Sequence, residues 1–187
     1  MSPTQVKPPD PTASDVLTPQ FWTGHAVRQP SAGVDLACTK IAVDLQNLTR
    51  ETADAVIRQS LEALRDAAEA EVAFSALLDS AGESIDSVTV ARGAFAQARP
   101  ESLRGLPLSA FPHLASRFDH LRLTDYRDTA AARRDQAAEA SRLATMEIGS
   151  ALLLAFRIQG RPAGLLGLAR STPAQGPWGA NIQLLLK

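Results

Sequence analysis

Two apolar runs near the end of the chain constrain its fold most strongly. Residues 151–156 read Ala-Leu-Leu-Leu-Ala-Phe, and residues 163–169 read Ala-Gly-Leu-Leu-Gly-Leu-Ala. A short segment containing Gly160 separates them, and two such runs around a glycine-containing turn predict a β-hairpin. Because residues 151–156 are all apolar, we expect this strand to be buried on both faces and to lie inside its sheet.

The composition indicates a single globular domain with appendages. The chain has 187 residues, and its formal net charge of −1 gives no indication of nucleic acid or an acidic membrane surface as a partner. No apolar run is long enough to span a bilayer, and the first residues lack the pattern of a signal peptide, so we expect a cytoplasmic protein. The single cysteine, Cys38, excludes an intrachain disulfide and an all-cysteine zinc site.

The first part of the chain divides into a tail and two helices. Residues 1–30 are rich in Pro, Ser and Thr, which predicts a tail that is disordered or docked onto the domain formed by residues 31–187. Phe21 and Trp22 in this tail dock either onto the domain itself or onto a partner. Within residues 31–70, apolar residues recur every three or four positions over 34–48 and again over 49–70, which predicts two helices.

Residues 71–187 are expected to form the core of the domain. We expect strands over residues 72–79, 88–95 and 120–124, a short helix after Ser109, and an alanine-rich helix over 129–145. A last helical pattern begins at Trp178 and continues to Lys187, which we interpret as the front end of a longer protein. This order predicts an α+β fold with a central antiparallel sheet of five or six strands and helices on both faces.

Several segments resemble GAF domains, which are small-molecule-sensing relatives of PAS domains. The resemblance covers about residues 49–187. Its motifs are a first strand that ends at Asp79, the segment Leu121–Asp125, the hairpin Ile148–Leu168, and Trp178 followed by Asn181-Ile182-Gln183-Leu184-Leu185. In addition, Leu106–Pro112 resembles GAF domains that precede a bacterial diguanylate cyclase (GGDEF) domain.

The resemblance implies a non-catalytic regulatory domain of a bacterial signalling protein. Its expected output domain is a diguanylate cyclase in cyclic di-GMP signalling, located outside this chain. We further expect a homodimer, in which helices 34–48, 49–70 and 178–187 form a bundle with a second chain, because ligand binding can reach an output domain only through an element with two arrangements. An unknown small-molecule ligand is the other expected partner, with no role for nucleic acid or a membrane.

The implied ligand pocket lies between the sheet and residues 109–145. Seven residues are candidates for contacting the ligand: Phe111, His113, Phe118, Leu123, Asp125, Tyr126 and Met146. His113 and His120 are either polar contacts or haem ligands, or ordinary surface histidines. Asp125 either contacts the ligand or organises the following turn by accepting backbone hydrogen bonds. Tyr126, the single tyrosine, either forms a pocket wall or closes the core.

The residues carry no signature of a particular cofactor. The cyclic-nucleotide signature of GAF domains is missing, and residues 128–146 lack the cysteine to which bilins attach. A single thiol cannot complete the catalytic cycle of the methionine sulfoxide reductases of this family, and no histidines have the spacing of a metal site. Asp135 and Glu139 have no nucleophile beside them and are interpreted as solvated carboxylates.

Two alternatives to a ligand-binding sensor remain open from the sequence. The first is a ligand-free dimerisation module, whose pocket is filled by its own large side chains: Phe111, Phe118, Leu123, Tyr126, Met146 and Phe156. The second is a haem-based gas sensor. Binding of a small molecule separates the first alternative from the sensor, and the absorbance of bound haem identifies the second.

Overall fold

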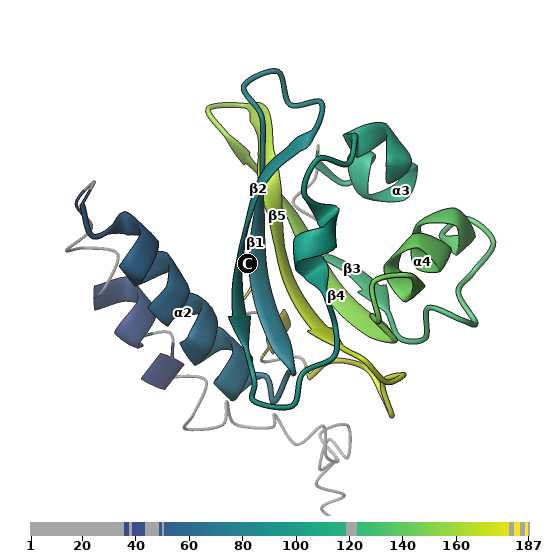
Figure 1. The fold of residues 1–187 in the computed structure, drawn as a ribbon, viewed down its shortest axis with the longest axis horizontal. Helices are drawn as coiled ribbons and strands as arrows, with labels where there is room; N and C mark the ends of the chain where they lie inside the picture. The colour runs from purple at the N-terminus through teal and green to yellow at the C-terminus, as the bar shows by residue number, and fades with distance from the viewer. Residues whose placement is uncertain are drawn as a thin grey trace, which may run out of the picture.

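A five-stranded antiparallel sheet forms the centre of the computed structural model (Figure 1). The structure describes residues 36–37, 39–43, 49, 51–118, 123–179, 182–183 and 186. The strand order is β2-β1-β5-β4-β3. The bounds are Val72–Leu78 for β1, Ile85–Arg92 for β2, Leu123–Tyr126 for β3, Ser150–Ile158 for β4 and Arg161–Arg170 for β5.

The predicted hairpin is formed by β4 and β5. Gln159 and Gly160 connect the strands and both have positive φ angles, 50° and 78°, as a tight turn matched to the twist of the strands requires. β4 lies between β3 and β5, and residues 150–155 are buried without exception. The expectation of an interior strand that is buried on both faces is therefore confirmed.

Side chains on the two faces of the sheet belong to separate hydrophobic clusters. On one face, Phe74 and Leu153 pack with residues of α3 (Pro112–Ala115) and α4 (Ala137–Ala144). On the other face, Leu152 and Leu154 pack with α2 (Ala53–Ala67). Figure 1 shows α2 on one side of the sheet and α3 and α4 on the other. The prediction of helices on both faces is confirmed, with five strands in the sheet.

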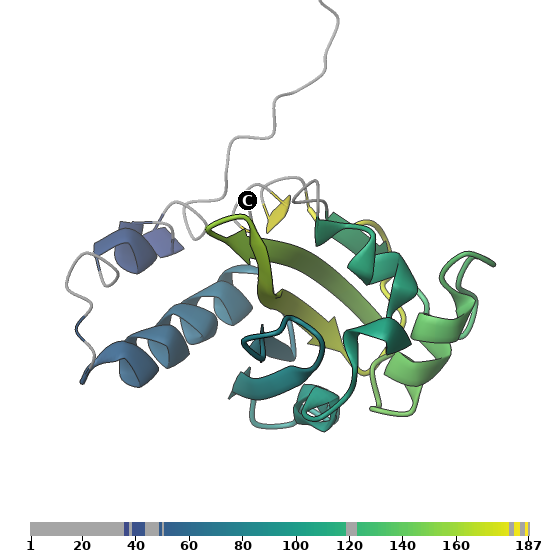
Figure 2. The same cartoon turned by 90° about the horizontal axis from the view of Figure 1, so that it is seen from above.

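Segments from both ends of the described chain lie on the α2 face. Trp178, Ile182 and Leu186 pack in the same cluster as α2. The helical residues 36–37 and 39–43 lie beside α2 and away from α3 and α4, as the view from above also shows (Figure 2). Arg170 joins this layer to the sheet, because its guanidinium stacks over the Trp178 ring at 4.2 Å and donates a hydrogen bond to the carbonyl of Ala68 at 3.1 Å.

Some helices are shorter than the sequence predicts. The alanine-rich segment 129–145 is helical over Ala137–Ala144 in α4, and residues before it form turns. The reason is that the Thr129 hydroxyl donates to the carbonyl of Ile148 at 2.8 Å and Asp128 accepts the N–H of Ala130 at 2.8 Å. These tertiary and turn contacts override the helix propensity of alanine.

Other boundaries also shift. The expected strand 88–95 begins at Ile85 and ends at Arg92, and the helix expected after Ser109 consists of a 3₁₀ turn, Leu108–Ala110, followed by α3. A further 3₁₀ turn spans Pro100–Leu103. Residues 1–30, Cys38 and His120 lie outside the described residues, as do most residues after Trp178. Within the described ranges, no helix has the length and apolar character needed to cross a bilayer.

Candidate ligand-binding site

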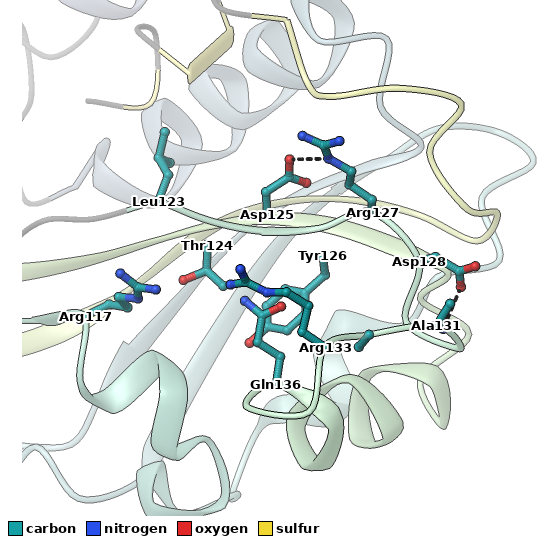
Figure 3. Close-up of a pocket in the computed structure, with 11 residues that line it drawn as sticks. Arg117, Leu123, Thr124, Asp125, Tyr126, Arg127, Asp128, Ala131, Arg133 and Gln136 are labelled. Carbon is teal, nitrogen blue, oxygen red and sulfur yellow. Dashed lines mark hydrogen bonds and ion pairs between the residues drawn. The ribbon is translucent and has the colours of Figure 1, made fainter.

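A cavity of about 500 Å³ lies beside β3, which is an edge strand of the sheet. Its walls are the four residues of β3, Arg117 after α3, and the turns that precede α4 (Figure 3). The lining residues are Arg117, Leu123, Thr124, Asp125, Tyr126, Arg127, Asp128, Ala131, Ala132, Arg133 and Gln136. The cavity thus occupies the region between the sheet and residues 109–145 in which the sequence places a pocket.

The structure separates the seven predicted site residues into three groups. Leu123, Asp125 and Tyr126 line the cavity. His113 lies behind the wall, where its Nε2 is 3.2 Å from Arg117 Nη2 and 3.1 Å from Gln136 Nε2. The remaining three are buried in the hydrophobic cluster on the same face of the sheet and are not lining residues: Phe111, Phe118 and Met146.

A buried carboxylate connects the cavity wall to α3. Glu139 of α4 is 1% exposed, and its Oε1 accepts the backbone N–H groups of His113 and, at 3.1 Å, of Leu114. Its Oε2 accepts a hydrogen bond from the Tyr126 hydroxyl. The interpretation of Glu139 as a solvated carboxylate is therefore wrong. Three donors offset the cost of removing its charge from water.

The same contacts raise the pKa of Tyr126. Burial of the phenol is the largest cause, followed by its hydrogen bond to Glu139 and the negative charge of that carboxylate. All three favour the neutral phenol over the phenolate. Tyr126 is therefore a hydrogen-bond donor in the cavity wall over the whole physiological pH range.

The contacts of His113 connect it to two residues of the cavity wall. A guanidinium group can only donate, so Nε2 of His113 accepts a hydrogen bond from Arg117 Nη2. Nδ1 of the ring lies 3.8 Å from Asp135 Oδ2. The imidazole holds Arg117 and Gln136 in place behind the cavity.

Three polar atoms in the cavity walls are buried without a hydrogen-bond partner in the described part of the chain. They are Arg117 Nε, Thr124 Oγ1 and Asp125 Oδ1. The other carboxylate oxygen of Asp125 lies 3.2 Å from Arg127 Nε. Buried polar groups in folded proteins are nearly always hydrogen-bonded, and exceptions need an explanation. These three atoms are themselves buried, belong to residues that line the cavity, and have free hydrogen-bonding capacity.

The turn before α4 is organised by Asp128 and not by Asp125. Asp128 Oδ1 accepts the backbone N–H groups of Ala130 at 2.8 Å and Ala131 at 3.3 Å. This is the role that the sequence assigns to Asp125 as an alternative to ligand contact. Among the described residues, no three of the histidine, cysteine and carboxylate side chains are grouped to hold a metal ion.

Sequence reasoning missed the polar residues of the cavity. The alternation of a strand places Thr124 on the same face as Tyr126, so Thr124 could have been found from the prediction of Tyr126. Arg117 lies between the apolar positions Leu114 and Phe118. On a helix, an arginine next to such a stripe is indistinguishable from a solvated residue by pattern alone.

Comparison with known proteins identifies the fold. No protein-family model matches the sequence, and no curated protein matches it. Among solved structures, the phycocyanobilin-bound GAF domain from a cyanobacterial phytochrome is similar, with a TM-score of 0.62, 13% identity and coverage of 82% of this chain and 87% of that chain.

Two further solved structures are similar. For the GAF domain of a phosphoenolpyruvate-protein phosphotransferase from Coxiella burnetii, the TM-score is 0.53 at 12% identity, covering 82% of this chain and 85% of that one. For the free methionine-R-sulfoxide reductase of Neisseria meningitidis in complex with its substrate, the TM-score is 0.56 at 17% identity, covering 82% and 81%. The five-stranded antiparallel sheet with helices on both faces is the fold of GAF domains.

Proposed function

We propose that this chain is a non-catalytic sensory GAF domain that binds a small molecule in the cavity beside β3. The observation that supports this most directly is the set of three unpartnered atoms in its walls, Arg117 Nε, Thr124 Oγ1 and Asp125 Oδ1. A bound molecule with matching polar groups on the Arg117 and Thr124 side of β3 would satisfy the first two. The size of the cavity, about 500 Å³, falls in the range of small-molecule sites.

The similar structures support a binding role, because two of them hold small molecules. The cyanobacterial GAF domain is described as phycocyanobilin-bound, and the Neisseria enzyme as in complex with its substrate. In this chain, residues 128–146 contain no cysteine for covalent bilin attachment. The proposed ligand is therefore held by non-covalent contacts.

A binding role is favoured over catalysis by the chemistry of the cavity. Its lining, as far as the described residues form it, includes no cysteine, serine or histidine, and Cys38 is the single thiol of the chain. The two lining carboxylates already have partners, since Asp125 contacts Arg127 and Asp128 holds the following turn. The Tyr126 hydroxyl contacts a carboxylate, Glu139, but its pKa is raised, which is the opposite of what an activated nucleophile requires.

The proposal includes a homodimer and an output domain. We propose that helices 34–48, 49–70 and 178–187 pair with a second chain in the cytoplasm of a bacterium, and that the regulated output is a diguanylate cyclase. The packing of α2 and Trp178 on one face of the sheet supports this arrangement, since Arg117, Thr124 and Tyr126 of the cavity lie on the other face. Sedimentation velocity tests the dimer: a monomer at all concentrations would contradict it.

A thermal-shift screen tests ligand binding. A one-site ligand at about 100 times its Kd stabilises the native state by roughly 2.7 kcal/mol. The expected hit stabilises the wild type, and its effect is reduced in a Thr124→Val variant, which keeps the shape of the side chain and removes the hydroxyl. Arg142→Gln, on an exposed position of α4, is the matched control and should respond as the wild type does.

A ligand-free dimerisation module is the second candidate. It is favoured by the burial of Phe111, Phe118 and Met146, which already fill the space between the sheet and α3 and α4. A screen of nucleotides, amino acids and fatty acids without any stabilisation, together with a dimer in sedimentation, would support this candidate over the sensor.

Haem binding through His113 is disfavoured by its contacts. Its Nε2 already accepts from Arg117 and Gln136, so coordination of iron would first require these contacts to break. A Soret absorbance band after addition of haem to the purified protein would restore the gas-sensor alternative.

A further inference from the structure

The geometry of the cavity points to a subsite for an oxyanion, formed by Arg117 and Thr124 with Arg133 at its exposed side. The inference rests on the proposed function and specifies its ligand, which carries a carboxylate or phosphate group. We infer this from unused hydrogen-bonding capacity and charge at these three residues.

Arg117 is the first component of the subsite. Its Nη2 contacts His113 Nε2 at 3.2 Å, whereas its Nε is buried and has no partner in the described part of the chain. No ion pair of the described residues involves Arg117. Burial of the Nε–H of a charged guanidinium without a hydrogen-bond acceptor is costly. Its planar fork matches the geometry of a carboxylate or phosphate.

Thr124 is the second component. It is 2% exposed, and its hydroxyl has no partner among the described residues although it lines the cavity. Figure 3 shows Arg117, Thr124, Arg133 and Gln136 on one side of β3. A hydroxyl can donate to an anion oxygen, so Thr124 and Arg117 supply two converging donors.

The carboxylates of the cavity do not oppose an anion at this position. Asp125 projects from the opposite side of β3, where it contacts Arg127 (Figure 3). Asp128 holds the turn before α4. Glu139 lies beneath Tyr126 and is already neutralised in part by three hydrogen-bond donors. The subsite is therefore bounded by donors and cations, with the Asp135 carboxylate beside Arg133 at its exposed side.

Arg133 supplies a second positive charge at the exposed side. Its side chain is 72% exposed, and its Nε lies 3.7 Å from Asp135 Oδ1, a long contact for an ion pair. A bound anion would compete with Asp135 for this guanidinium. Exposure screens the contribution of Arg133, so Arg117 and Thr124 carry the selectivity of the subsite.

Nitrogen–proton NMR of the whole chain tests the subsite, because arginine Nε–H groups give resolved signals. The probes are inorganic phosphate, phenyl phosphate, 3-phenylpropionate and 3-phenylpropionamide. The amide has nearly the shape of 3-phenylpropionate without its charge, and the aromatic ring suits the apolar part of the lining. We expect the anions to shift the Arg117 Nε–H signal and to bind about tenfold or more tightly than the amide. The probe that shifts the Arg117 Nε–H signal more, phosphate or carboxylate, identifies which of the two groups the natural ligand carries.

Three variants make the result specific. Arg117→Gln removes the charge, Thr124→Val removes the hydroxyl, and each should weaken anion binding about tenfold or more without affecting the amide. Arg142→Gln on the exposed surface of α4 is the control and should bind all probes as the wild type does. A dispersed amide spectrum establishes that each variant is folded, and Thr124→Val provides the test if Arg117→Gln does not fold.

The outcomes distinguish the subsite from the proposed function. Binding of the amide or of other neutral compounds in the cavity, with no response of Arg117 to any anion, would overturn the subsite and leave the sensor proposal in place. Equal affinity of anions for the wild type and Thr124→Val would also overturn it. If no compound of any class binds, both proposals fail.

Discussion

The Tyr126 hydroxyl donates a hydrogen bond to the buried carboxylate of Glu139, which joins the edge strand β3 to the helix α4. The same carboxylate accepts the backbone N–H groups of His113 and Leu114 in α3. One side chain thus connects three elements that surround the cavity. Its removal would leave a phenol and two backbone donors without partners.

Replacement of Glu139 is expected to destabilise the domain in proportion to the number of hydrogen-bond donors that lose their acceptor. Glu139→Leu leaves all three unpaired and should lower the free energy of unfolding by about 3 kcal/mol or more. Glu139→Gln keeps one acceptor oxygen for the α3 amides, and its amide can donate to the Tyr126 oxygen, so the loss should be roughly 1 kcal/mol. Urea denaturation measures both. Equal losses for the two variants would contradict the role of the carboxylate.

The pKa of Tyr126 predicts a loss of stability at alkaline pH. Burial and the Glu139 contact raise this pKa in the folded state, whereas the unfolded chain ionises near the ordinary value of about 10. A raised pKa contributes stability that is present below pH ~10 and is lost above it, by about 1.4 kcal/mol per pH unit while the folded phenol stays neutral. The difference between wild type and Tyr126→Phe isolates this effect.

The single tyrosine also allows a direct optical measurement. Tyrosinate absorbance should remain absent in the native protein above pH ~10 and appear together with unfolding. Ionisation of the folded protein near the ordinary pKa would show that Tyr126 is not held by burial and Glu139.

Removal of the Thr124 hydroxyl is expected to stabilise the ligand-free protein. The hydroxyl is buried without a partner in the described residues, and replacement of such a group by a methyl group recovers up to about 1 kcal/mol. Thr124→Val should therefore raise the free energy of unfolding in urea while weakening anion binding. Thr124→Ser keeps the hydroxyl and serves as the control. A clear loss of stability in Thr124→Val would mean that the hydroxyl is already satisfied.

Gly167 in β5 is expected to be intolerant of any side chain. A Cβ at this position would collide with the ring of Phe74 and lie 2.8 Å from Leu153 Cδ2. Gly167→Ala should cost about 1–3 kcal/mol through overpacking, measured by denaturation. Gly176→Ala, where a Cβ would meet nothing within 4 Å, should be close to neutral.

A double variant identifies the cause of that loss. If the Phe74 ring is what excludes a side chain, Gly167→Ala combined with Phe74→Leu should cost less than the sum of the two single changes. Additive losses of unfolding free energy would show that the strain in Gly167→Ala does not come from the Phe74 ring.

Periodic patterns predicted the parts of the fold that bury apolar surface. The hairpin of β4 and β5 and the stripe that buries Leu61 and Leu64 of α2 follow from local spacing. Residues 129–136 were predicted as helix because alanine favours it. They form turns because Asp128 accepts the backbone N–H of Ala130 and the Thr129 hydroxyl donates to the carbonyl of Ile148. The second contact depends on the position of the chain just before β4.

The lining of the cavity could be predicted from the sequence only in part. Leu123, Asp125 and Tyr126 follow from their place on the mid-domain strand and line the cavity. Glu139 was missed because a charged residue in a charged helical segment has no local sign of burial. Its environment arises from Tyr126 and from the start of α3, which lie 13 and 25 or more residues away in sequence.

The alternation of side chains along β4 gives the sheet a mechanical property. Leu153 packs on the cavity side, while its neighbours Leu152 and Leu154 pack beneath α2 and Trp178. If the proposed ligand moves β3, β4 moves with it through the hydrogen bonds that the two strands share. Because neighbouring residues of β4 pack on opposite faces of the sheet, such a movement would reach the side chains under α2 and Trp178 without any additional element.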